Sequence, residues 1–326
     1  MVNTQNKKRI KVKYVDFWNG NTGWQKLNIR HIIDKHYDVE LSEEPDYLIC
    51  SCFGDNYKNF DCIRIMLIGE NFSTDWNEYD YGIDFDDYEL LDRHFHMINN
   101  AFIAYGYPSV ERMLTKHLHA EEIFKEKTDF CSYMFSHKVG FRDGFFKKLS
   151  EYKKINSGGK CLNNTDVTPG VEAKLEFEKK HKFSIAFENS VRPGYITEKL
   201  VDAFAAGTIP IYYGAPDVTK YFNEKAMIVI KSLDEIPNAI ERIKEIDNND
   251  ELYLSMLKEN AVVDKAIFDN YPKEFEEFVC HIFDQPLEEA RRRTRYKRRI
   301  DVPRFEKLVQ NGADNLCKLY RKVRRK

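Results

Sequence analysis

The sequence predicts an α/β fold with two domains, each built on a mainly parallel sheet. Its 326 residues exceed the roughly 250 to 300 residues at which a single hydrophobic core stops growing. Short apolar runs bounded by turn residues alternate with helix-like segments, which is typical of parallel strands covered by helices. This alternation starts near the N-terminus and starts again at residue 129. We therefore expect two domains that face a shared cleft.

The first half opens with a strand in IKVKYVDFW, which leads into a turn at Asn19-Gly20-Asn21. A helix is expected over residues 24–37. Two buried strands follow, in DYLICSCFG (46–54) and in CIRIMLIGEN (62–71), because short continuous apolar runs indicate strands covered on both faces. Residues 79–127 are rich in aromatic residues and histidines, and their periodicity predicts no element.

The second half opens with a strand in DFCSYMFSH (129–137) and a helix in RDGFFKKLSEYKKI. Further on, HKFSIAFEN predicts a strand, ITEKLVDAFAAG (196–207) a helix ended by Gly207, and TIPIYYG the next strand. The two halves together predict Rossmann-like domains with ligands at the carboxyl ends of the strands. We expect an N-terminal domain over residues 1–126, a C-terminal domain over 127–285 and a basic tail over 286–326.

The composition favours a soluble protein with large cores. Hydrophobic residues make up 42% of the chain, aromatic residues 14% and charged residues 32%. No apolar run approaches the ~20 residues needed to cross a bilayer, and no apolar signal core stands at the start. The seven cysteines form no CxxC pair, which argues against a disulfide framework or a zinc site. A cytoplasmic location is expected.

Charge is divided unevenly between the body and the end of the chain. Residues 291–326 carry a net charge of +12, from 15 Lys+Arg and 3 Asp+Glu, whereas residues 1–290 carry −14. Basic clusters gain about 1 kcal/mol per Lys or Arg near anionic lipid, so we expect attachment to the inner face of a membrane. A solvated helix is the alternative, and the acidic body argues against nucleic acid. The apolar face of a tail helix would contain Leu308, Val309, Leu316, Leu319 and Tyr320.

The stretch FSIAFENSVRPGYITEKLVDAFAAGTIPIYYGAP, residues 183–216, carries the strongest chemical signal. Glu198 and Lys199 open its helix shortly after a turn at Pro193-Gly194. A helix N-terminus offers free N–H groups and positive potential to an anion, and Lys199 adds a full charge. A diphosphate is therefore the expected ligand at this helix.

Neutral polar groups of the same stretch could hold a sugar. Asn189, Ser190 and Tyr195 supply donors and acceptors for ribose or sugar hydroxyls, and Glu198 could accept hydrogen bonds from such hydroxyls. The simpler alternative is an ordinary polar turn followed by a capped helix whose charged side chains face solvent.

The order FENS…GYITEKL…AGTIPIYYG resembles the nucleotide-sugar signature of glycosyltransferase family 10, the α-1,3/4-fucosyltransferases. Weaker resemblance extends from about Val12 to Asp269. The resemblance implies the GT-B arrangement of two Rossmann-like domains facing a central cleft. It also implies transfer of fucose from GDP-fucose with inversion of the anomeric centre. We expect no obligatory cofactor. GDP-fucose would be the donor substrate, and stimulation by a divalent metal stays open.

The resemblance assigns donor-binding roles to particular residues. The signature's Asn and Tyr correspond to Asn189 and Tyr195, and its Glu-Lys pair corresponds to Glu198 and Lys199. The segment Val191-Arg192-Pro193 departs from the family, which often has His or Gln ahead of the Tyr. Arg192 is a candidate for an additional contact to phosphate.

Arg142 in SHKVGFRDGFFKKL matches the family's arginine after the first strand of the donor domain. The resemblance implies that this arginine reaches the diphosphate, and a planar guanidinium suits phosphate because it makes paired charge-assisted hydrogen bonds. A surface arginine paired with Asp143 or Glu151 is the alternative.

Glu70 in LIGENFSTDWNEYDYGIDF matches the family's general base in the acceptor domain. An inverting transfer needs a group that removes the hydroxyl proton of the acceptor while the anomeric carbon is attacked opposite the leaving diphosphate. Gly69 before it would permit close approach of a substrate. A solvated glutamate at a strand end is the alternative, and Glu78 or an aspartate of 84–87 would be the next candidate base.

Two other groups of residues receive a structural interpretation. Asp84-Phe85-Asp86 has the form of a metal-binding triplet but lies in an acid-rich stretch, so we expect a solvated loop and no metal. Arg142 and Lys199 can replace a metal at the leaving group. His94 and His96 lack a nearby third ligand and are predicted to be structural.

Phe17, Trp18 and Trp24 are candidate acceptor-binding residues, because aromatic rings stack on the faces of sugars. Packing in the core is the alternative interpretation for all three.

The function predicted from the sequence is α-1,3 or α-1,4 fucosylation of a GlcNAc or Glc residue, with N-acetyllactosamine or lactose as acceptor. Lewis-type antigen synthesis and glycosylation of lipopolysaccharide or protein are examples of such transfer. One alternative is a transferase that uses another GDP-sugar for polysaccharide assembly. Another is a catalytically silent module that binds a glycan or a nucleotide sugar. A binding module would not need Glu70, Arg142 and Lys199 together.

Overall fold

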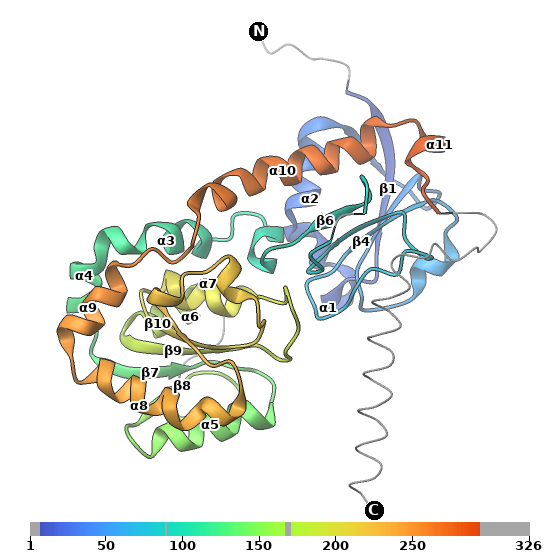
Figure 1. The fold of residues 1–326 in the computed structure, drawn as a ribbon. Helices are drawn as coiled ribbons and strands as arrows, with labels where there is room; N and C mark the ends of the chain where they lie inside the picture. Colours follow the sequence, from blue (N-terminus) through green and yellow to red (C-terminus); the bar gives the residue numbers. More distant parts are fainter. Residues whose placement is uncertain (1–6, 89, 167–170, 294–326) are drawn as a thin grey trace, which may run out of the picture.

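Two parallel sheets, one in each half of the chain, form the framework of the molecule (Figure 1). The structure, a computed structural model, describes residues 7–88, 90–166 and 171–293. The strand order is β2-β1-β3-β4-β5-β6 in the first sheet and β11-β10-β9-β7-β8 in the second. The structure therefore confirms the predicted α/β class with two Rossmann-like sheets.

The first sheet is built from residues 9–96 of the chain. Its central strands have every residue buried, as their apolar sequences YLIC and IRIML predict. The helix predicted over 24–37 is shorter, because Leu27 takes an extended conformation between a 3-10 turn, η1 (Gly23–Lys26), and the α-helix. The elements are β1 (Arg9–Val15), α1 (Trp18–Asn21), α2 (Asn28–His36), β2 (Asp38–Leu41), β3 (Tyr47–Cys50), β4 (Ile63–Leu67), β5 (Tyr81–Asp84) and β6 (His94–His96).

The second sheet contains the predicted strand–helix–strand unit. Its helix ends at Ala205, two residues before Gly207. Gly207 has a φ of +67° and sits so close to Ile123 that a Cβ there would lie 2.7 Å from the isoleucine side chain. The elements are β7 (Asp129–Tyr133), α5 (Gly140–Ser150), β8 (Ile155–Ser157), α6 (Val171–Lys179), β9 (His181–Phe187), α7 (Glu198–Ala205), β10 (Ile209–Tyr213), β11 (Ile228–Val229), α8 (Ile236–Asp247) and α9 (Asp250–Lys258).

The packing of helices cuts across the domain limits predicted at residues 126 and 285. The helices α3 (Ser109–Thr115) and α4 (Ala120–Lys125) precede residue 126 but pack with the second domain, through residues such as Met113 and Ala120. A linker, residues 97–108, leads from the first sheet to α3 and contains the 3-10 turn η3 (Asn100–Ile103).

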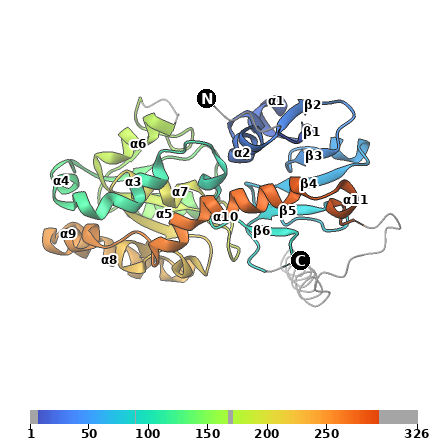
Figure 2. The ribbon, with the colours of Figure 1, turned by 90° about the horizontal axis from the view of Figure 1, so that it is seen from above.

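Helix α10 (Lys265–Asp284) returns from the second domain to the first, as Figures 1 and 2 show. Phe268 and Tyr271 lie in the core of the second domain, whereas Phe275 and Val279 lie in the core beneath the first sheet. Pro272 stands between these two sets inside the helix, where its missing N–H interrupts the hydrogen-bond pattern. The first domain is thus completed by residues near the end of the described chain.

The first three arginines of the predicted basic tail belong to the first domain. After α11 (Leu287–Ala290), Arg291 pairs with Asp61 and Arg292 with Asp92. Arg293 pairs with Asp80, whose carboxylate is fully buried, at 2.9 Å. The rest of the tail, including all five apolar residues of its predicted helix face, lies outside the described residues. None of the helices within the described ranges has the length and apolar character to span a bilayer.

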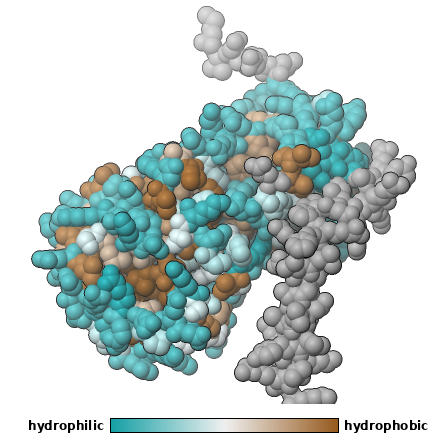
Figure 3. Space-filling view, in the orientation of Figure 1, coloured by the Kyte–Doolittle hydropathy of each residue, from teal (hydrophilic) through white to brown (hydrophobic). Residues whose placement is uncertain are grey.

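The surface is mainly hydrophilic in the view of Figure 3, with hydrophobic patches on both lobes of the molecule. Exposed aromatic side chains include Phe53, 51% exposed, and Phe72, 58% exposed, both in loops of the first domain.

Candidate active site

A cavity of about 410 Å³ lies between the two domains. It is bordered by the loop after β4, the linker, the loops after β7 and β9, and the start of α7, so the strands point their carboxyl ends at it. Six of the predicted site residues line this cavity, namely Glu70, Arg142, Asn189, Tyr195, Glu198 and Lys199. Residues far apart in the sequence therefore meet where the sequence analysis expects the donor and the base.

Arg142 is a buried cation with no carboxylate partner in the described chain. It lies in the first turn of α5 and is 1% exposed. Its guanidinium stacks on the ring of Phe135 at 3.8 Å and makes long hydrogen bonds to the carbonyls of Phe187 and His137 and to Asn189 Oδ1, at 3.5, 3.3 and 3.2 Å. Its Nε has no hydrogen-bond partner among the described residues. Burial lowers the pKa of Arg142, so a bound anion would supply the missing counter-charge.

Lys199 is also at the cavity, but carboxylates already neutralise its charge. Its Nζ donates to Thr197 Oγ1 at 2.8 Å and lies 3.3 Å from Glu188 and 3.4 Å from Glu198. Burial alone would lower the pKa of Lys199, but the two glutamates raise it above its ordinary range. The lysine is therefore charged and held in place before any ligand arrives.

The expectation that free N–H groups of α7 seat the diphosphate is wrong. Thr197 N donates to Glu188 Oε1 at 2.7 Å, and Glu198 N donates to Asn100 Oδ1 at 2.7 Å. Lys199 N approaches Thr197 Oγ1 at 3.5 Å. The sequence did not reveal these acceptors, because Glu188 ends a strand and Asn100 comes from the linker. Positive charge for a diphosphate must come from side chains.

Each of the two carboxylate oxygens of Glu198 has its own partner at the cavity. Oε2 accepts a hydrogen bond from Asn100 Nδ2 at 2.8 Å, and Oε1 lies 3.4 Å from Lys199 Nζ. Burial would raise the pKa of Glu198, but Lys199, Lys174 and the bond from Asn100 lower it to about 2. Glu198 is thus an ionised acceptor, as a group that binds sugar hydroxyls requires.

Tyr195 contributes a hydroxyl to the cavity from an otherwise buried ring. The side chain is 1% exposed and packs edge-to-face on Phe85 at 5.0 Å. Burial raises the pKa of Tyr195, so the phenol stays protonated and can donate a hydrogen bond. The preceding Gly194 has a φ of +75°, and a Cβ there would lie 2.1 Å from the carbonyl oxygen of Phe85, so only glycine fits this turn.

Glu70 faces the donor-site residues from the first domain. It follows β4, is half-buried, and its carboxylate makes no hydrogen bond to the described chain. Burial raises the pKa of Glu70, while Lys199 opposes that rise and Glu198 adds to it. An unpaired carboxylate with a raised pKa at the cavity edge is suited to accept a proton. A Cβ at Gly69 would meet Ile103 at 3.4 Å, an ordinary contact, so packing in the protein does not demand glycine there.

Ser190 and Arg192 do not line the cavity. Ser190 Oγ accepts a hydrogen bond from Asn71 Nδ2 at 2.5 Å, and Arg192 donates to Asn71 Oδ1 at 3.0 Å. Arg192 also pairs with Asp86. These contacts tie the loop after β9 to the first domain. Arg192, the candidate phosphate contact, is therefore held by a carboxylate away from the donor residues.

The Asp84-Phe85-Asp86 triplet is structural rather than the expected solvated loop. Asp84 is fully buried and accepts from Thr74 N at 2.9 Å, from Asp86 N at 2.9 Å, and lies 3.0 Å from His94 Nε2. His94 thus has the predicted structural role. Within the described ranges, no group of three or more His, Cys, Asp or Glu side chains could hold a metal ion.

The three aromatic residues proposed for the acceptor differ in their surroundings. Phe17 is buried in the core, and Trp24 stacks on Tyr14 at 4.2 Å. Trp18 and Trp24 are both half-buried, but Trp18 packs edge-to-face on exposed Phe53 at 6.0 Å. Of the three, Trp18 therefore remains the best candidate to touch a sugar.

Two exposed rings near Glu70 escaped the sequence analysis. Phe72 N donates to Glu70 O at 2.7 Å, so Phe72 lies in the same turn as the candidate base. Cys52 precedes Phe53, and burial together with the charge of Glu70 raises the Cys52 pKa. Phe72 thus adjoins the candidate base, whereas Phe53 follows a cysteine whose pKa responds to the charge of Glu70. The exposure of the two rings is a signal that only the fold supplies.

Other cavity residues also escaped the sequence analysis. Lys174 pairs with buried Asp202 at 2.7 Å, and Asp202 accepts from Tyr107 at 2.9 Å and from Ser109 at 2.7 Å. Asn100 comes from the segment to which no element was assigned. No local motif marks these residues, because they act through partners distant in sequence.

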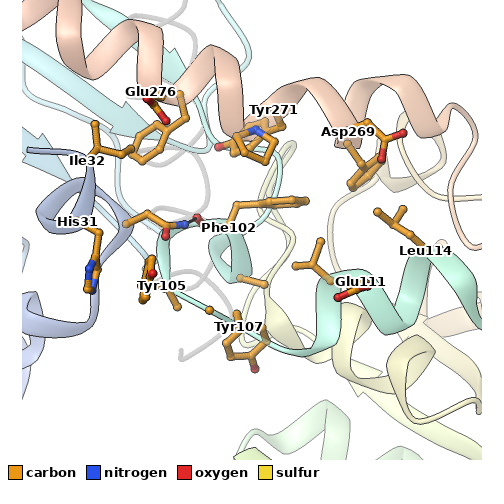
Figure 4. A pocket seen from close by; sticks show the side chains of 18 of the residues that line it. His31, Ile32, Phe102, Tyr105, Tyr107, Glu111, Leu114, Asp269, Tyr271 and Glu276 are labelled. Carbon is orange, nitrogen blue, oxygen red and sulfur yellow. Dashed lines mark hydrogen bonds between the residues drawn. The ribbon is translucent and has the colours of Figure 1, made fainter. Parts of the chain in front are cut away.

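A larger cavity, about 910 Å³, lies behind the linker and is shown in Figure 4. Helices α2, α3 and α10 surround it, and Phe102, Tyr105 and Tyr271 are among its aromatic lining residues. Tyr107 borders both cavities. The larger cavity contains none of the predicted catalytic or donor-binding residues, so its size alone does not make it the active site.

Comparison with known proteins gives matches along most of the chain. The model of the C-terminal domain of glycosyltransferase family 10 (fucosyltransferase) matches residues 124–302, which is 179 of 326 residues. The model of the N-terminal domain of the α-(1,3)-fucosyltransferase FucT matches residues 12–105. The α-(1,3)-fucosyltransferase FucT of Helicobacter pylori is 28% identical over 293 residues, which cover 78% of this chain and 60% of that protein.

Solved structures show the same fold. A crystal structure of an α1,3-fucosyltransferase has a TM-score of 0.68 at 23% identity and covers 83% of this chain and 92% of that one. A structure of an α1,3-fucosyltransferase with GDP-fucose has a TM-score of 0.65 at 23% identity, over 86% of this chain and 93% of that one. The two-sheet architecture is thus of the GT-B type.

Proposed function

Because the chain belongs to glycosyltransferase family 10, the fucosyltransferases, we propose that it transfers L-fucose from GDP-fucose to a sugar hydroxyl with inversion. One observation carries the proposal: Glu70 of the first domain lines the same cavity as Arg142, Tyr195, Glu198 and Lys199 of the second. One α1,3-fucosyltransferase of this fold has been solved with GDP-fucose, which supports this donor.

The proposed reaction is a single displacement. Glu70 takes the proton of the acceptor hydroxyl as its oxygen attacks the anomeric carbon of fucose. The bond from that carbon to the diphosphate oxygen breaks, and its electron pair leaves with GDP on the opposite face, which inverts the anomeric centre. Arg142 and Lys199 stabilise the negative charge of the departing GDP. Asn189, Tyr195 and Glu198 bind the ribose and fucose hydroxyls.

We propose a GlcNAc or Glc residue as the acceptor, in α-1,3 or α-1,4 linkage. The exposed rings of Phe53 and Phe72, and Trp18 behind Phe53, offer apolar surfaces for a sugar next to Glu70. An acceptor with two sugar residues could place one ring at Glu70 and the other on this surface. N-acetyllactosamine and lactose have this size.

The decisive test is to incubate the protein with GDP-fucose and a panel of disaccharides and to identify the products by NMR. We expect fucose in α linkage on a GlcNAc- or Glc-containing acceptor, and no product with Glu70→Gln. Transfer from GDP-mannose but not from GDP-fucose would instead favour another GDP-sugar. Binding of GDP-fucose without transfer to any acceptor would favour the silent binding module.

We further propose that the basic tail attaches the enzyme to the inner face of a membrane. The net charge of the last 36 residues supports this, and the structure defines where to cut. Removing residues 294–326 should preserve transfer and thermal stability but reduce binding to phosphatidylserine vesicles at low salt. Equal vesicle binding by both proteins would contradict the proposal.

A shorter protein, residues 1–290, tests whether the cut must leave the three arginines 291–293 in place. It loses Arg293 and leaves the buried Asp80 without its cation. Breaking a buried pair costs about 3 to 5 kcal/mol, so this version should unfold at a clearly lower temperature than residues 1–293. Equal melting temperatures would show that the arginines do not stabilise the first domain.

A further inference from the structure

Two adjacent asparagines of the linker hold the first residues of the donor-site helix. Asn99 Nδ2 donates to Thr197 O at 2.8 Å, across 98 positions of sequence. Asn100 reaches the next residue, Glu198. Asn99 is fully buried, and its own Oδ1 accepts from Ala101 N at 2.8 Å, which fixes the turn that carries Asn100. The linker of the first domain thus contacts the start of α7 directly.

Asn100 makes two hydrogen bonds to Glu198, and it is the acceptor in one of them and the donor in the other. Its Oδ1 accepts from Glu198 N at 2.7 Å, and its Nδ2 donates to Glu198 Oε2 at 2.8 Å. A side-chain amide offers the acceptor at the Oδ1 position and the donor at the Nδ2 position. An ionised aspartate has no donor, and an apolar side chain has neither group. The other carboxylate oxygen of Glu198 lies beside Lys199. One oxygen of Glu198 is therefore oriented by the linker and the other by its own helix.

We infer that Asn100 is a positioning residue of the donor site, which orients the Glu198 carboxylate for the hydroxyls of GDP-fucose. The inference rests on the proposed function, because it takes GDP-fucose as the ligand of Glu198. It adds a contact from the linker to a site otherwise formed by the second domain. Donor binding then depends on the position of the linker that joins the two domains.

An aspartate at position 100 would distinguish positioning from packing. Asn100→Asp keeps the volume and the bond from Glu198 N, but it places a second carboxylate against Glu198 Oε2. Two carboxylates at such a short distance cannot both stay charged. One of them therefore takes up a proton near neutral pH. With that proton, an O–H···O bond replaces the lost N–H···O bond. The charged or titratable groups that also act on Glu198 are Lys199, Lys174, Glu188, Glu70, Tyr107 and Tyr195.

The experiment measures GDP-fucose affinity by calorimetry between about pH 5 and pH 8 for the wild type, Asn100→Asp and Asn100→Ala. Asn100→Ala should bind roughly 10- to 100-fold more weakly at every pH, as for the loss of a hydrogen bond to a charged group. Asn100→Asp should be at least as weak at the high end of the range and approach the wild type at the low end. The wild type carries the same surrounding titratable groups. The difference in GDP-fucose affinity between the wild type and Asn100→Asp at each pH therefore reports the effect of position 100.

Asn249→Asp is the matched control. Asn249 caps α9 by accepting from Leu252 N at 3.0 Å on an exposed surface, and aspartate caps helices equally well. It should match the wild type at every pH. Wild-type affinity in both position-100 variants would overturn the inference, and so would a loss in Asn100→Asp that does not change with pH. If Asn100→Asp does not fold, the alanine variant alone decides. Failure of the wild type to bind GDP-fucose would overturn the proposed function itself.

Discussion

The two walls of the interdomain cavity are organised in opposite ways. On the donor wall, Glu188, Thr197, Glu198 and Lys199 hold one another through short hydrogen bonds and ion pairs. On the acceptor wall, Glu70 has no hydrogen-bond partner for its carboxylate in the described chain, and exposed Phe72 lies in the same turn. A wall of mutually bonded groups needs little reorganisation when the donor binds, which favours catalysis. The open wall leaves the base free and can accept sugars of different shape.

The donor wall itself contains two cations in contrasting states. Lys199 lies against two glutamates, whereas Arg142 has only an aromatic ring and three long hydrogen bonds. A ligand diphosphate would therefore gain more from Arg142, whose charge is not yet compensated, than from Lys199. Lys199 contributes to stability as well as to the site.

The largest effect is expected on the acceptor wall. Glu70→Gln keeps the volume of the side chain but cannot take a proton, so kcat should fall by ~10²- to 10⁴-fold while GDP-fucose affinity is unchanged. Azide needs no base, and its addition should partly restore fucose release from this variant. Stopped-flow or product assays, with calorimetry for the donor, measure both quantities. Near-normal kcat with intact folding would move the base elsewhere, with Glu78 or the 84–87 aspartates next.

The pH dependence of kcat/KM gives a second test of Glu70 as the general base. Burial raises the pKa of Glu70 above its ordinary value of 4.5, and only the deprotonated form is a base. The rate constant kcat/KM should therefore fall as pH is lowered through this raised pKa, at a higher pH than an exposed glutamate would give. The residual activity of Glu70→Gln should lack this fall. An identical acidic limb in both proteins would show that another group titrates.

Next in size is the contrast between Arg142→Met and Lys199→Ala. Both should weaken GDP binding by roughly 10- to 100-fold, through loss of a charge-assisted phosphate contact. Only Lys199→Ala should lower the melting temperature clearly, because it leaves the fully buried Glu188 without its cation. Unchanged GDP affinity by calorimetry would remove the residue concerned from the site. Equal melting temperatures would contradict the distinction drawn between the two cations.

The smallest effects are expected from the aromatic rings of the acceptor wall. Phe53→Ala and Trp18→Ala should raise the acceptor KM several-fold, as for the loss of about 1 kcal/mol of ring contact, with donor affinity unchanged. Trp24→Ala is the control, because half-buried Trp24 stacks on buried Tyr14, so its loss should lower stability instead. An unchanged acceptor KM in both surface variants would separate these rings from the acceptor.

The sequence predicted the parts of the site that lie together in one stretch. Asn189, Tyr195, Glu198 and Lys199 share the β9–α7 connection, and that connection faces the cavity as a unit. The parallel strands were also predictable, because their apolar runs are continuous. Arg142 and Glu70 were found through the resemblance alone, since a single Arg or Glu has no local pattern.

The errors arose where a role depends on partners from elsewhere in the chain. Arg192 stands within the same stretch as the donor residues but turns toward Asp86 of the first domain. The N–H groups of α7 were expected to be free, yet Glu188 and Asn100 occupy two of them. The local sequence shows where a helix begins, but it does not show which distant side chains bind the N–H groups at its N-terminus.

The path of α10 has a consequence for the order in which the protein can fold during synthesis. Phe275, Val279, Ile282 and Phe283 complete the core beneath the first sheet, whose other buried members are residues from 10–103 together with Tyr195 and Ala290. A ribosome must therefore finish nearly the whole second domain before the first can close. Until then the apolar face that α10 covers stays open to water, and it is a natural surface for a chaperone to protect. The N-terminal domain is first to be made and last to be completed.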